Sequence, residues 1–151
     1  MQASIETVEP TDAARQSISV PLVAFNESLI GSQGYAPFAI LIRDAENGTA
    51  VGGLWAQFLN DWLHVDLLFV PESLRRSGIG TRIMQTAEAL AAEKQCVGIW
   101  LDTYSFQAPG FYDKLGYEIF GRLPDHPRGH ERIFLRKLLR DSVRSPASVH
   151  V

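Results

Sequence analysis

The chain is short of cysteine, of long apolar runs and of positive charge. Cys96 is the only cysteine among 151 residues, so no internal disulfide can form, and this suits a reducing compartment such as the cytoplasm. No apolar run reaches the roughly 18 residues that span a bilayer, and the first ten residues lack the features of a signal peptide. The formal net charge is -3, whereas nucleic-acid binding favours a basic face. We therefore expect a cytoplasmic protein that binds neither membranes nor nucleic acid.

Metal binding is also disfavoured, because no cysteines and histidines have the spacing of zinc ligands. His126 and His130 are four residues apart, but two prolines and a glycine in the loop at residues 123–130 prevent the helix that would align them. Cys96 lies in an apolar stretch, where a buried structural thiol is favoured over a nucleophile. We expect no metal.

The chain does have enough apolar residues for one core. Apolar residues make up 46% of the sequence and charged residues 21%, which is typical of a folded globular domain. One domain is the default at this length. We expect a single domain over residues 1–139 and a flexible tail over residues 140–151, where the chain turns polar.

Hydrophobic periodicity predicts the elements of the first half. Residues 4–8 alternate between apolar and polar side chains and are predicted to form a strand. Residues 12–30 are predicted to be helical, interrupted near Pro21 into two short helices, and to end at Gly31. Three strands are predicted next, at residues 38–42, 49–59 and 62–70. The tight turns between them, one of which carries Asn47-Gly48, indicate an antiparallel meander.

The second half alternates helices and strands. Helices are predicted at residues 78–94 and 109–115, and strands at residues 97–101, 117–122 and 132–138, with a long polar loop between the last two strands. The strand, helix, strand order at residues 62–101 requires a parallel pair. The predicted fold class is therefore α/β, with a mixed, mostly antiparallel central sheet and helices on both faces.

The segment from Phe69 to Gly80, FVPESLRRSGIG, joins an apolar strand to an amphipathic helix. The free N–H groups and the positive dipole end of a helix start attract anions. The glycines allow a large anion to approach the backbone, and the arginines suit bidentate phosphate contacts. The alternative is a helix that needs glycine only to pack closely on its strand. We favour a site for a ligand that carries a diphosphate.

This turn resembles the coenzyme A pyrophosphate loop of GNAT-type N-acetyltransferases, through Arg75-x-x-Gly78-x-Gly80 after an apolar strand. A second segment, PGFYDKLGYE at residues 109–118, resembles the late helix and strand of the same family, with Tyr112, Gly116 and an aromatic residue in the expected order. The two motifs are separated by one helix and one strand, as in that family. The resemblance extends over roughly residues 5–138, although the first 35 residues match only in the order of strand and helix.

The resemblance implies acetyl-CoA as co-substrate and a set of residues that hold it. Backbone groups of Leu68, Phe69 and Val70 would bond the pantetheine amides. The pyrophosphate would be held by the amides of the turn, with added charge from the arginines: Arg75, Arg76, Ser77, Gly78, Ile79 and Gly80. The family often has an asparagine where this chain has Ser105. Ser105 or Gln107 would contact the pantetheine arm, and a helix cap at Ser105 is the equal alternative.

The resemblance also implies catalytic roles. Tyr112 would protonate the departing thiolate, because a phenol with a pKa of about 10 carries its proton at neutral pH; the alternative is an aromatic core residue. A carboxylate on the fourth strand of the family often accepts the amine proton, sometimes through water. Asp66 occupies that place, and His64 is a second candidate base. Alternation places His64, Asp66 and Leu68 on one face; for both candidates the alternative is a polar residue on a half-exposed strand.

The acceptor is less defined. The loop at residues 123–130 holds Asp125, His126, Arg128 and His130, which would recognise an acceptor with both amine and carboxylate or would simply be solvated. Trp55 and Gln57 either line the acceptor pocket or, for Trp55, pack in the core.

The sequence thus indicates an enzyme that moves an acetyl group from acetyl-CoA to a primary amine by direct attack, with a small-molecule acceptor favoured. The alternatives are a coenzyme A-binding module without transfer and an acetyltransferase acting on protein lysines or N-termini. A homodimer stays open, since dimers are common among soluble proteins.

Overall fold

The computed structural model describes residues 2–139 and divides the chain into two compact units, Met1–Gln33 and Gly34–Val151. The predicted tail at residues 140–151 lies outside the described residues. A single domain over residues 1–139 stays a prediction.

The first unit contains one helix, α1 (Asp12–Ile30). Thr11 caps its start by accepting a hydrogen bond from the N–H of Ala14 at 3.1 Å. Gly31 closes its end with a φ of 77°, as predicted. The prediction of two short helices is wrong, because α1 continues through Pro21. Proline removes one helical hydrogen bond, but its fixed φ near −65° is itself a helical value.

The predicted strand at residues 4–8 is also wrong, since residues 2–11 have neither helix nor strand. Ile5 is 102% exposed and Val8 is 57% exposed. Alternation alone does not make a strand, because the backbone also needs a neighbouring strand to accept and donate its hydrogen bonds.

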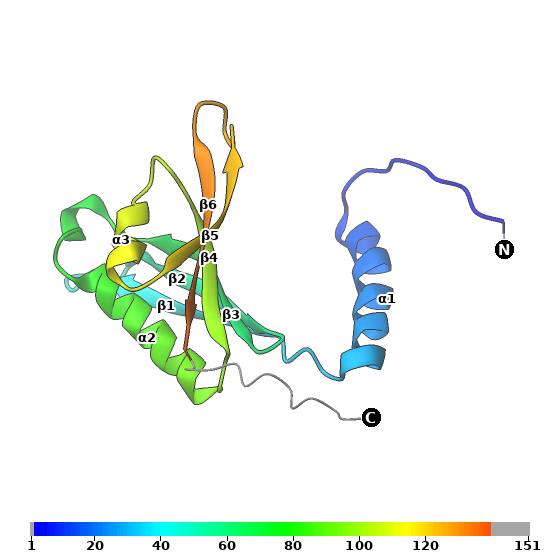
Figure 1. The fold of residues 1–151 in the computed structure, drawn as a ribbon, viewed down its shortest axis with the longest axis horizontal. Helices are drawn as coiled ribbons and strands as arrows, with labels where there is room; N and C mark the ends of the chain where they lie inside the picture. Colours follow the sequence, from blue (N-terminus) through cyan, green and yellow to red (C-terminus); the bar gives the residue numbers. More distant parts are fainter. Residues whose placement is uncertain (1, 140–151) are drawn as a thin grey trace, which may run out of the picture. The chain divides into compact units, whose positions relative to one another are not determined.

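The second unit is built on a mixed sheet of six strands, in the order β1-β2-β3-β4-β6-β5 (Figure 1). Of its five pairings, only that of β3 with β4 is parallel. This confirms the mixed, mostly antiparallel sheet and the crossover between β3 and β4. The strands are β1 (Ala36–Arg43), β2 (Ala50–Leu59), β3 (Trp62–Phe69), β4 (Gly98–Tyr104), β5 (Glu118–Pro124) and β6 (Glu131–Leu138).

Tight turns set the register of the meander β1-β2-β3. Gly48 closes the first turn with a φ of 73°, and Asn60 and Asp61 both have positive φ, at 49° and 64°, in the second. Positive φ at both central residues matches the right-handed twist of a hairpin. Both predicted turns are confirmed.

One face of the sheet carries the core. The crossover between β3 and β4 contains a short 3-10 helix, η1 (Glu72–Leu74), and α2 (Ile79–Glu93), and α3 (Pro109–Lys114) follows β4. Both α2 and α3 lie on the same side of the sheet (Figure 1). The fully buried side chains of this layer are Leu63, Met84, Ile99, Leu101 and Leu135. Helices on both faces stay a prediction, because α1 belongs to the other unit.

The last two strands are longer than predicted. The ladder between β5 and β6 extends to the pair Pro124↔Glu131, so the connecting loop is only residues 125–130. The sequence did not indicate this extension, because β5 ends in a proline and neither of its faces holds a buried residue that would produce an alternating pattern. Within residues 2–139, no helix is both long and apolar enough to cross a membrane.

Candidate active site

The sheet opens between β3 and β4. These strands are paired only from Trp62↔Gly98 to Val65↔Leu101. Beyond Val65, β3 stays bonded to β2, and beyond Leu101, β4 stays bonded to β6. The two halves of the sheet therefore diverge (Figure 1). Each presents a backbone edge without a strand partner, and an extended ligand with amide groups can pair with such an edge.

The helix α2 begins at the mouth of this opening. Its N-cap is Gly78, whose φ of 81° lies in the left-handed region, and no side chain caps the helix. The carbonyl of Gly78 accepts the N–H of Arg82 at 3.0 Å. The N–H groups of the first turn point out of the helix without a capping acceptor, and the first turn has no acidic residue. An anion is the natural partner for such an end.

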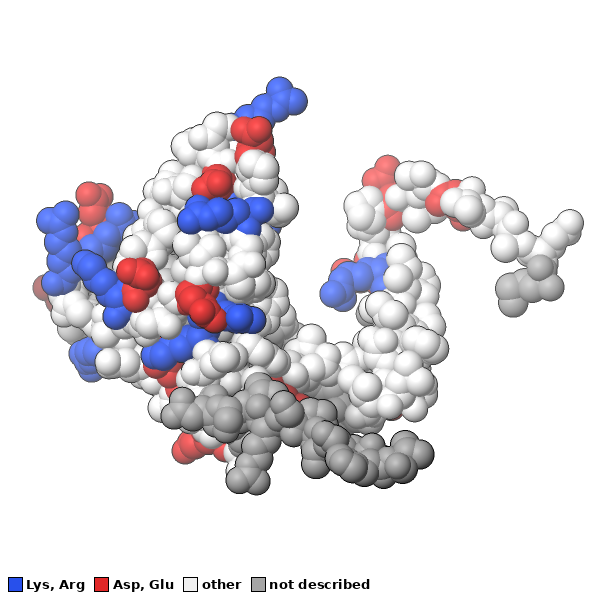
Figure 2. Space-filling model, viewed as in Figure 1, with Lys and Arg blue, Asp and Glu red and all other residues white. Residues whose placement is uncertain are grey.

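Two arginines precede this helix start. Arg75 donates its Nε to the carbonyl of Val70 at 3.1 Å, which ties the loop to the end of β3. Arg76 has a φ of 63°, and the Ser77 hydroxyl donates to the carbonyl of Leu74 at 2.5 Å. Lysine and arginine side chains gather at the side of the molecule where this loop lies (Figure 2). The loop is therefore both preshaped and positively charged.

The two glycines of the loop differ in what surrounds them. A Cβ at Gly78 would meet no atom within 4 Å, whereas one at Gly80 would lie 3.3 Å from Cζ of Phe111. Gly80 thus supports the packing alternative, because it allows α2 to approach α3. Gly78 supports the anion site, since its space opens to solvent while its backbone requires glycine.

A β-bulge alters the face on which Asp66 and its neighbours lie. Trp55 pairs with Leu67 and Ala56 pairs with Val65, so Asp66 is the extra residue of β3. Leu68 then lies opposite the buried Leu54 and packs against the core. The prediction that Leu68 shares a face with His64 and Asp66 is wrong, because one inserted residue reverses the alternation beyond it.

Asp66 contacts His64 on the face of the sheet opposite the core. Nδ1 of His64 lies 2.6 Å from Oδ1 of Asp66, and the Gln57 amide lies 3.5 Å from the same oxygen. The His64 ring stacks on Trp100, with centroids 3.7 Å apart and planes at 12°. Nε2 of His64 is buried and has no hydrogen-bond partner among the residues that the structure describes. Asp66 therefore holds the proton on Nδ1 and leaves a lone pair on Nε2.

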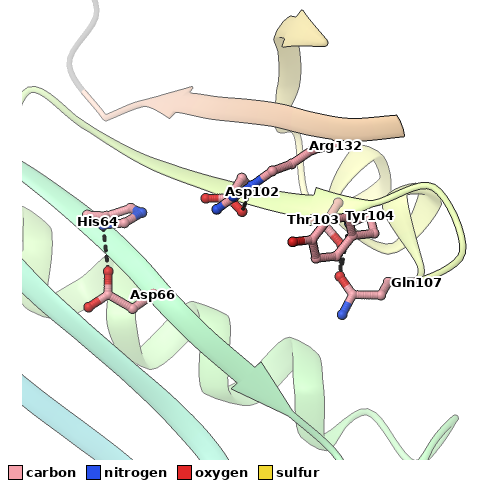
Figure 3. A network of polar contacts seen from close by, with 7 residues as sticks. All are labelled: His64, Asp66, Asp102, Thr103, Tyr104, Gln107 and Arg132. Carbon is pink, nitrogen blue, oxygen red and sulfur yellow. Dashed lines mark hydrogen bonds and ion pairs between the residues drawn. The ribbon is translucent and has the colours of Figure 1, made fainter. Parts of the chain in front are cut away.

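The charges around His64 oppose one another. Burial lowers the pKa of His64 below 6.5, and Arg132 acts in the same direction, whereas Asp66 and Asp102 raise it. Arg132 donates Nε to Asp102 at 2.7 Å, and this ion pair lies across the opening from His64 (Figure 3). The net result is a lowered pKa, which favours the neutral imidazole.

Sequence reasoning missed Asp102, Arg132 and the stacking role of Trp100. Trp100, Asp102 and Tyr104 alternate along β4 with the buried Ile99, Leu101 and Thr103. The alternation along β4 could have indicated that Trp100, Asp102 and Tyr104 share the face opposite the core. The nearly continuous apolar run at residues 97–101 instead suggested a strand covered on both faces.

Tyr112 lies in α3, within the core layer. It is 9% exposed and makes edge contacts with the rings of Phe111 and Tyr117. Burial raises the pKa of Tyr112 to about 12, and the charge of Asp102 adds to the shift. The phenol therefore keeps its proton well above neutral pH.

Ser105 and Gln107 organise the end of β4. The Ser105 hydroxyl accepts the N–H of Glu131 at 3.0 Å, and Oε1 of Gln107 accepts from the Thr103 hydroxyl at 2.8 Å. The helix-cap alternative for Ser105 is wrong, because the N-cap of α3 is Ala108. A contact of Ser105 or Gln107 with pantetheine stays a prediction.

The sequence analysis considered burial in the core for both Cys96 and Trp55. Cys96 is buried at 3% exposure, as predicted, whereas Trp55 is 46% exposed and does not pack in the core. Asp125 and His126 lie together in the β5–β6 loop, beside Tyr104. Among residues 2–139, no group of three histidine, cysteine or acidic side chains could hold a metal ion.

Comparison with known proteins places the chain in one family. The model of the acetyltransferase (GNAT) family matches residues 9–117. A blasticidin-S acetyltransferase of Streptomyces morookaense is 43% identical over 96 residues, which are 63% of this chain and 68% of that protein. An acetyltransferase of Agrobacterium fabrum is 34% identical over 124 residues, 82% of this chain and 90% of that one. The crystal structure of an acetyltransferase from Agrobacterium tumefaciens has a TM-score of 0.83 at 30% identity, covering 91% of this chain and 99% of that one.

The chain therefore belongs to the GNAT acetyltransferase family. It is an acyltransferase that uses acetyl-CoA as co-substrate to acetylate an amine. This favours the enzyme over the coenzyme A-binding module that the sequence left open. The cytoplasmic location and the homodimer stay predictions.

Substituting Gly78 tests the anion site at the start of α2. We expect Gly78→Val to weaken acetyl-CoA binding at least about tenfold, because a β-branched side chain destabilises the left-handed backbone and covers the amides. Isothermal titration calorimetry measures the Kd. The matched control is Gly48→Val, since Gly48 has a similar φ of 73° and also no atom within 4 Å of its Cβ position. That control should lose stability and keep its affinity; an unchanged Kd in Gly78→Val would mean that the turn does not hold the phosphates.

Proposed function

We propose that this enzyme acetylates a primary amine on a small molecule, with His64, positioned by Asp66, accepting the amine proton and Tyr112 protonating the thiolate. The observation that carries this proposal is the contact of 2.6 Å between His64 and Asp66 beside the opening of the sheet.

The preference for a small acceptor rests on two observations. The relative with 43% identity is named for blasticidin S, a small molecule. A cavity of about 520 Å³ lies between the end of β4 and the β5–β6 loop, within the size range of small-ligand pockets. An acceptor held on a protein lysine or N-terminus is the less supported alternative. Blasticidin S is accordingly the first acceptor to assay.

The co-substrate is held in the opening between β3 and β4. The pantetheine amides pair with the backbone of Leu68 and Phe69, and the pyrophosphate binds the amides from Arg76 to Gly80. Val70 contributes less than expected, because its carbonyl already accepts Arg75. The backbone N–H near Leu68 polarises the thioester carbonyl.

His64 and Asp66 act as one proton acceptor. An amine with a pKa near 10 is mostly protonated at pH 7 and must lose a proton to attack. Nε2 of His64 carries the lone pair, and the proton reaches this buried nitrogen through a water. Asp66 fixes the tautomer and stabilises the imidazolium that forms. Asp66 is then a positioning residue, whereas the sequence had made it the first candidate base, acting through a water.

Tyr112 completes the transfer. The amine nitrogen bonds to the thioester carbonyl carbon, and the carbon–sulfur bond breaks as the tetrahedral intermediate collapses. The sulfur leaves with the bonding electrons and takes the phenolic proton, while the nitrogen of the intermediate gives its excess proton to water and becomes the amide nitrogen. Since the pKa of Tyr112 is raised to about 12, the phenol is fully protonated when it is needed and regains its proton from solvent afterwards.

The overall activity is tested by mixing the enzyme with acetyl-CoA and a panel of amines and measuring the release of free thiol. The panel contains blasticidin S, an aminoglycoside, free amino acids, polyamines and a lysine-containing peptide. We expect turnover with small amines and little with the peptide. Turnover confined to the peptide would contradict the small-molecule acceptor.

The role of Tyr112 is tested with Tyr112→Phe, which keeps the buried ring. We expect kcat to fall about a hundredfold, the lower end of what general acid catalysis contributes, with little change in the Kd for acetyl-CoA. The control is Tyr117→Phe, which removes a hydroxyl from the same cluster, one bonded to Glu88 at 3.1 Å. That control should lower stability and spare kcat. Equal kcat in Tyr112→Phe and the wild type would remove Tyr112 from the mechanism.

The role of His64 is tested by the pH profile of kcat/KM. Because burial and Arg132 lower the pKa of His64, the imidazole is neutral above that pKa, and protonation should reduce activity only as the pH falls below 6.5. His64→Gln should no longer show this decrease of kcat/KM at acid pH, which is the acid limb of the profile, and its kcat should be lower. Asp66→Asn should shift the limb to lower pH, because it removes a charge that raises the pKa of His64. An identical limb in His64→Gln would assign the titration to another group.

A further inference from the structure

A second group of side chains borders the opening at the far end of β4. A shallow cavity of about 520 Å³ is lined by Tyr104, Phe106, Asp125, His126 and Pro127. These residues come from the end of β4, the segment after it, and the β5–β6 loop. The mechanism proposed above uses none of them.

The wall of this cavity is aromatic. The rings of Tyr104 and Phe106 are parallel, at 5.1 Å and 6°, and His126 stacks on Tyr104 at 5.8 Å. Phe106 is 56% exposed. An exposed ring of this size attracts flat groups and cations, because its face is apolar and carries partial negative charge. The guanidinium of Arg132 already lies 5.7 Å from the Tyr104 ring, which shows that this ring accepts a planar cation.

One carboxylate completes the cavity. Oδ1 of Asp125 accepts the N–H of Gly129 at 3.1 Å, which fixes the loop. No ion pair joins Asp125 to any residue in the range 2–139. Arg132 is not a competitor, because it is paired with Asp102 at 2.7 Å. The charge of Asp125 is therefore available to a ligand with N–H donors.

The cavity and the proton acceptor lie on one face of the sheet. Trp100, which stacks on His64, and Tyr104 are both on β4 and alternate with its buried residues. Trp100 and Tyr104 are four positions apart along the strand, which corresponds to a distance of about 13 Å. A single small molecule can therefore reach both places.

We propose that this cavity binds a planar cationic group, a guanidinium or amidinium, carried by the same acceptor whose amine is acetylated beside His64. A guanidinium stacks on aromatic faces and donates paired hydrogen bonds to a carboxylate, which is the combination that Phe106 and Asp125 offer. The inference rests on the proposed function and adds the acceptor's second recognition group. It differs from the expectation that the loop recognises an acceptor with both amine and carboxylate or is simply solvated, because here the carboxylate of Asp125 is matched to a cation of the acceptor.

The proposal is tested with two matched amines. Each has an eight-carbon chain and one primary amine, and only one of them ends in a guanidinium. We expect kcat/KM to be about tenfold higher for the guanidino-amine, mainly through KM, as one stacked and hydrogen-bonded cation provides. In Asp125→Asn this ratio should approach one, because asparagine can still accept the N–H of Gly129 but has no charge. The control Glu118→Gln removes a charge from β5 outside the cavity and should keep the ratio.

A ratio near one in the wild type, or an unchanged ratio in Asp125→Asn, would overturn the proposal. A second measurement is independent of turnover. Butylguanidinium, which has no primary amine, is titrated while the NMR signals of the Tyr104 and Phe106 ring protons are followed. Shifts that saturate in the wild type and weaken in Asp125→Asn support the site even if no amine is acetylated, in which case only the proposed function fails. Absence of shifts overturns the site while any acetylation of small amines stands.

Discussion

The end of the ladder between β3 and β4 is the constraint on which the rest of the site depends. A parallel pair that stops at Val65↔Leu101 leaves two backbone edges facing each other. Such edges are normally costly. Here each strand is still bonded on its outer side, β3 to β2 and β4 to β6, so the opening persists within a stable sheet. The helix start of α2 and the polar groups around His64 are both placed by this divergence.

The bulge at Asp66 determines which residues of β3 face the core and which face the opposite side of the sheet. Before the bulge, Leu63 and Val65 fill the core; after it, Leu68 does. Asp66 contacts His64 on the side opposite the core, and the extra residue returns Leu68 to the core side. A regular strand would bury either the carboxylate or a different apolar residue, and both changes would destabilise the fold. The contact between His64 and Asp66 and the intact core are therefore compatible because one residue is left out of the pairing.

Much of the fold was predictable because it depends on local signals. The turns at Gly48 and at Asn60 and Asp61, the end of α1 at Gly31, and the helix after Gly78 all follow from residues that favour positive φ or free amides. The strand at residues 4–8 and the break at Pro21 were predicted wrongly, because alternation and proline are local preferences that neighbouring structure can override. In the site, the charged loop and Tyr112 were located from motifs. The bulge at Asp66 and the pairing of Asp102 with Arg132, 30 residues apart, depend on strand register, which no single segment encodes.

The contact between Gly80 and Phe111 connects two parts of the enzyme that the sequence keeps apart. Gly80 is in the first turn of α2, and Phe111 immediately precedes Tyr112 in α3. Because a side chain at position 80 would press on the Phe111 ring, a displacement of the first turn of α2 acts directly on α3, the helix that carries Tyr112. Under the proposed function, binding of the coenzyme at the start of α2 and the position of the Tyr112 phenol are therefore coupled through this one packing contact.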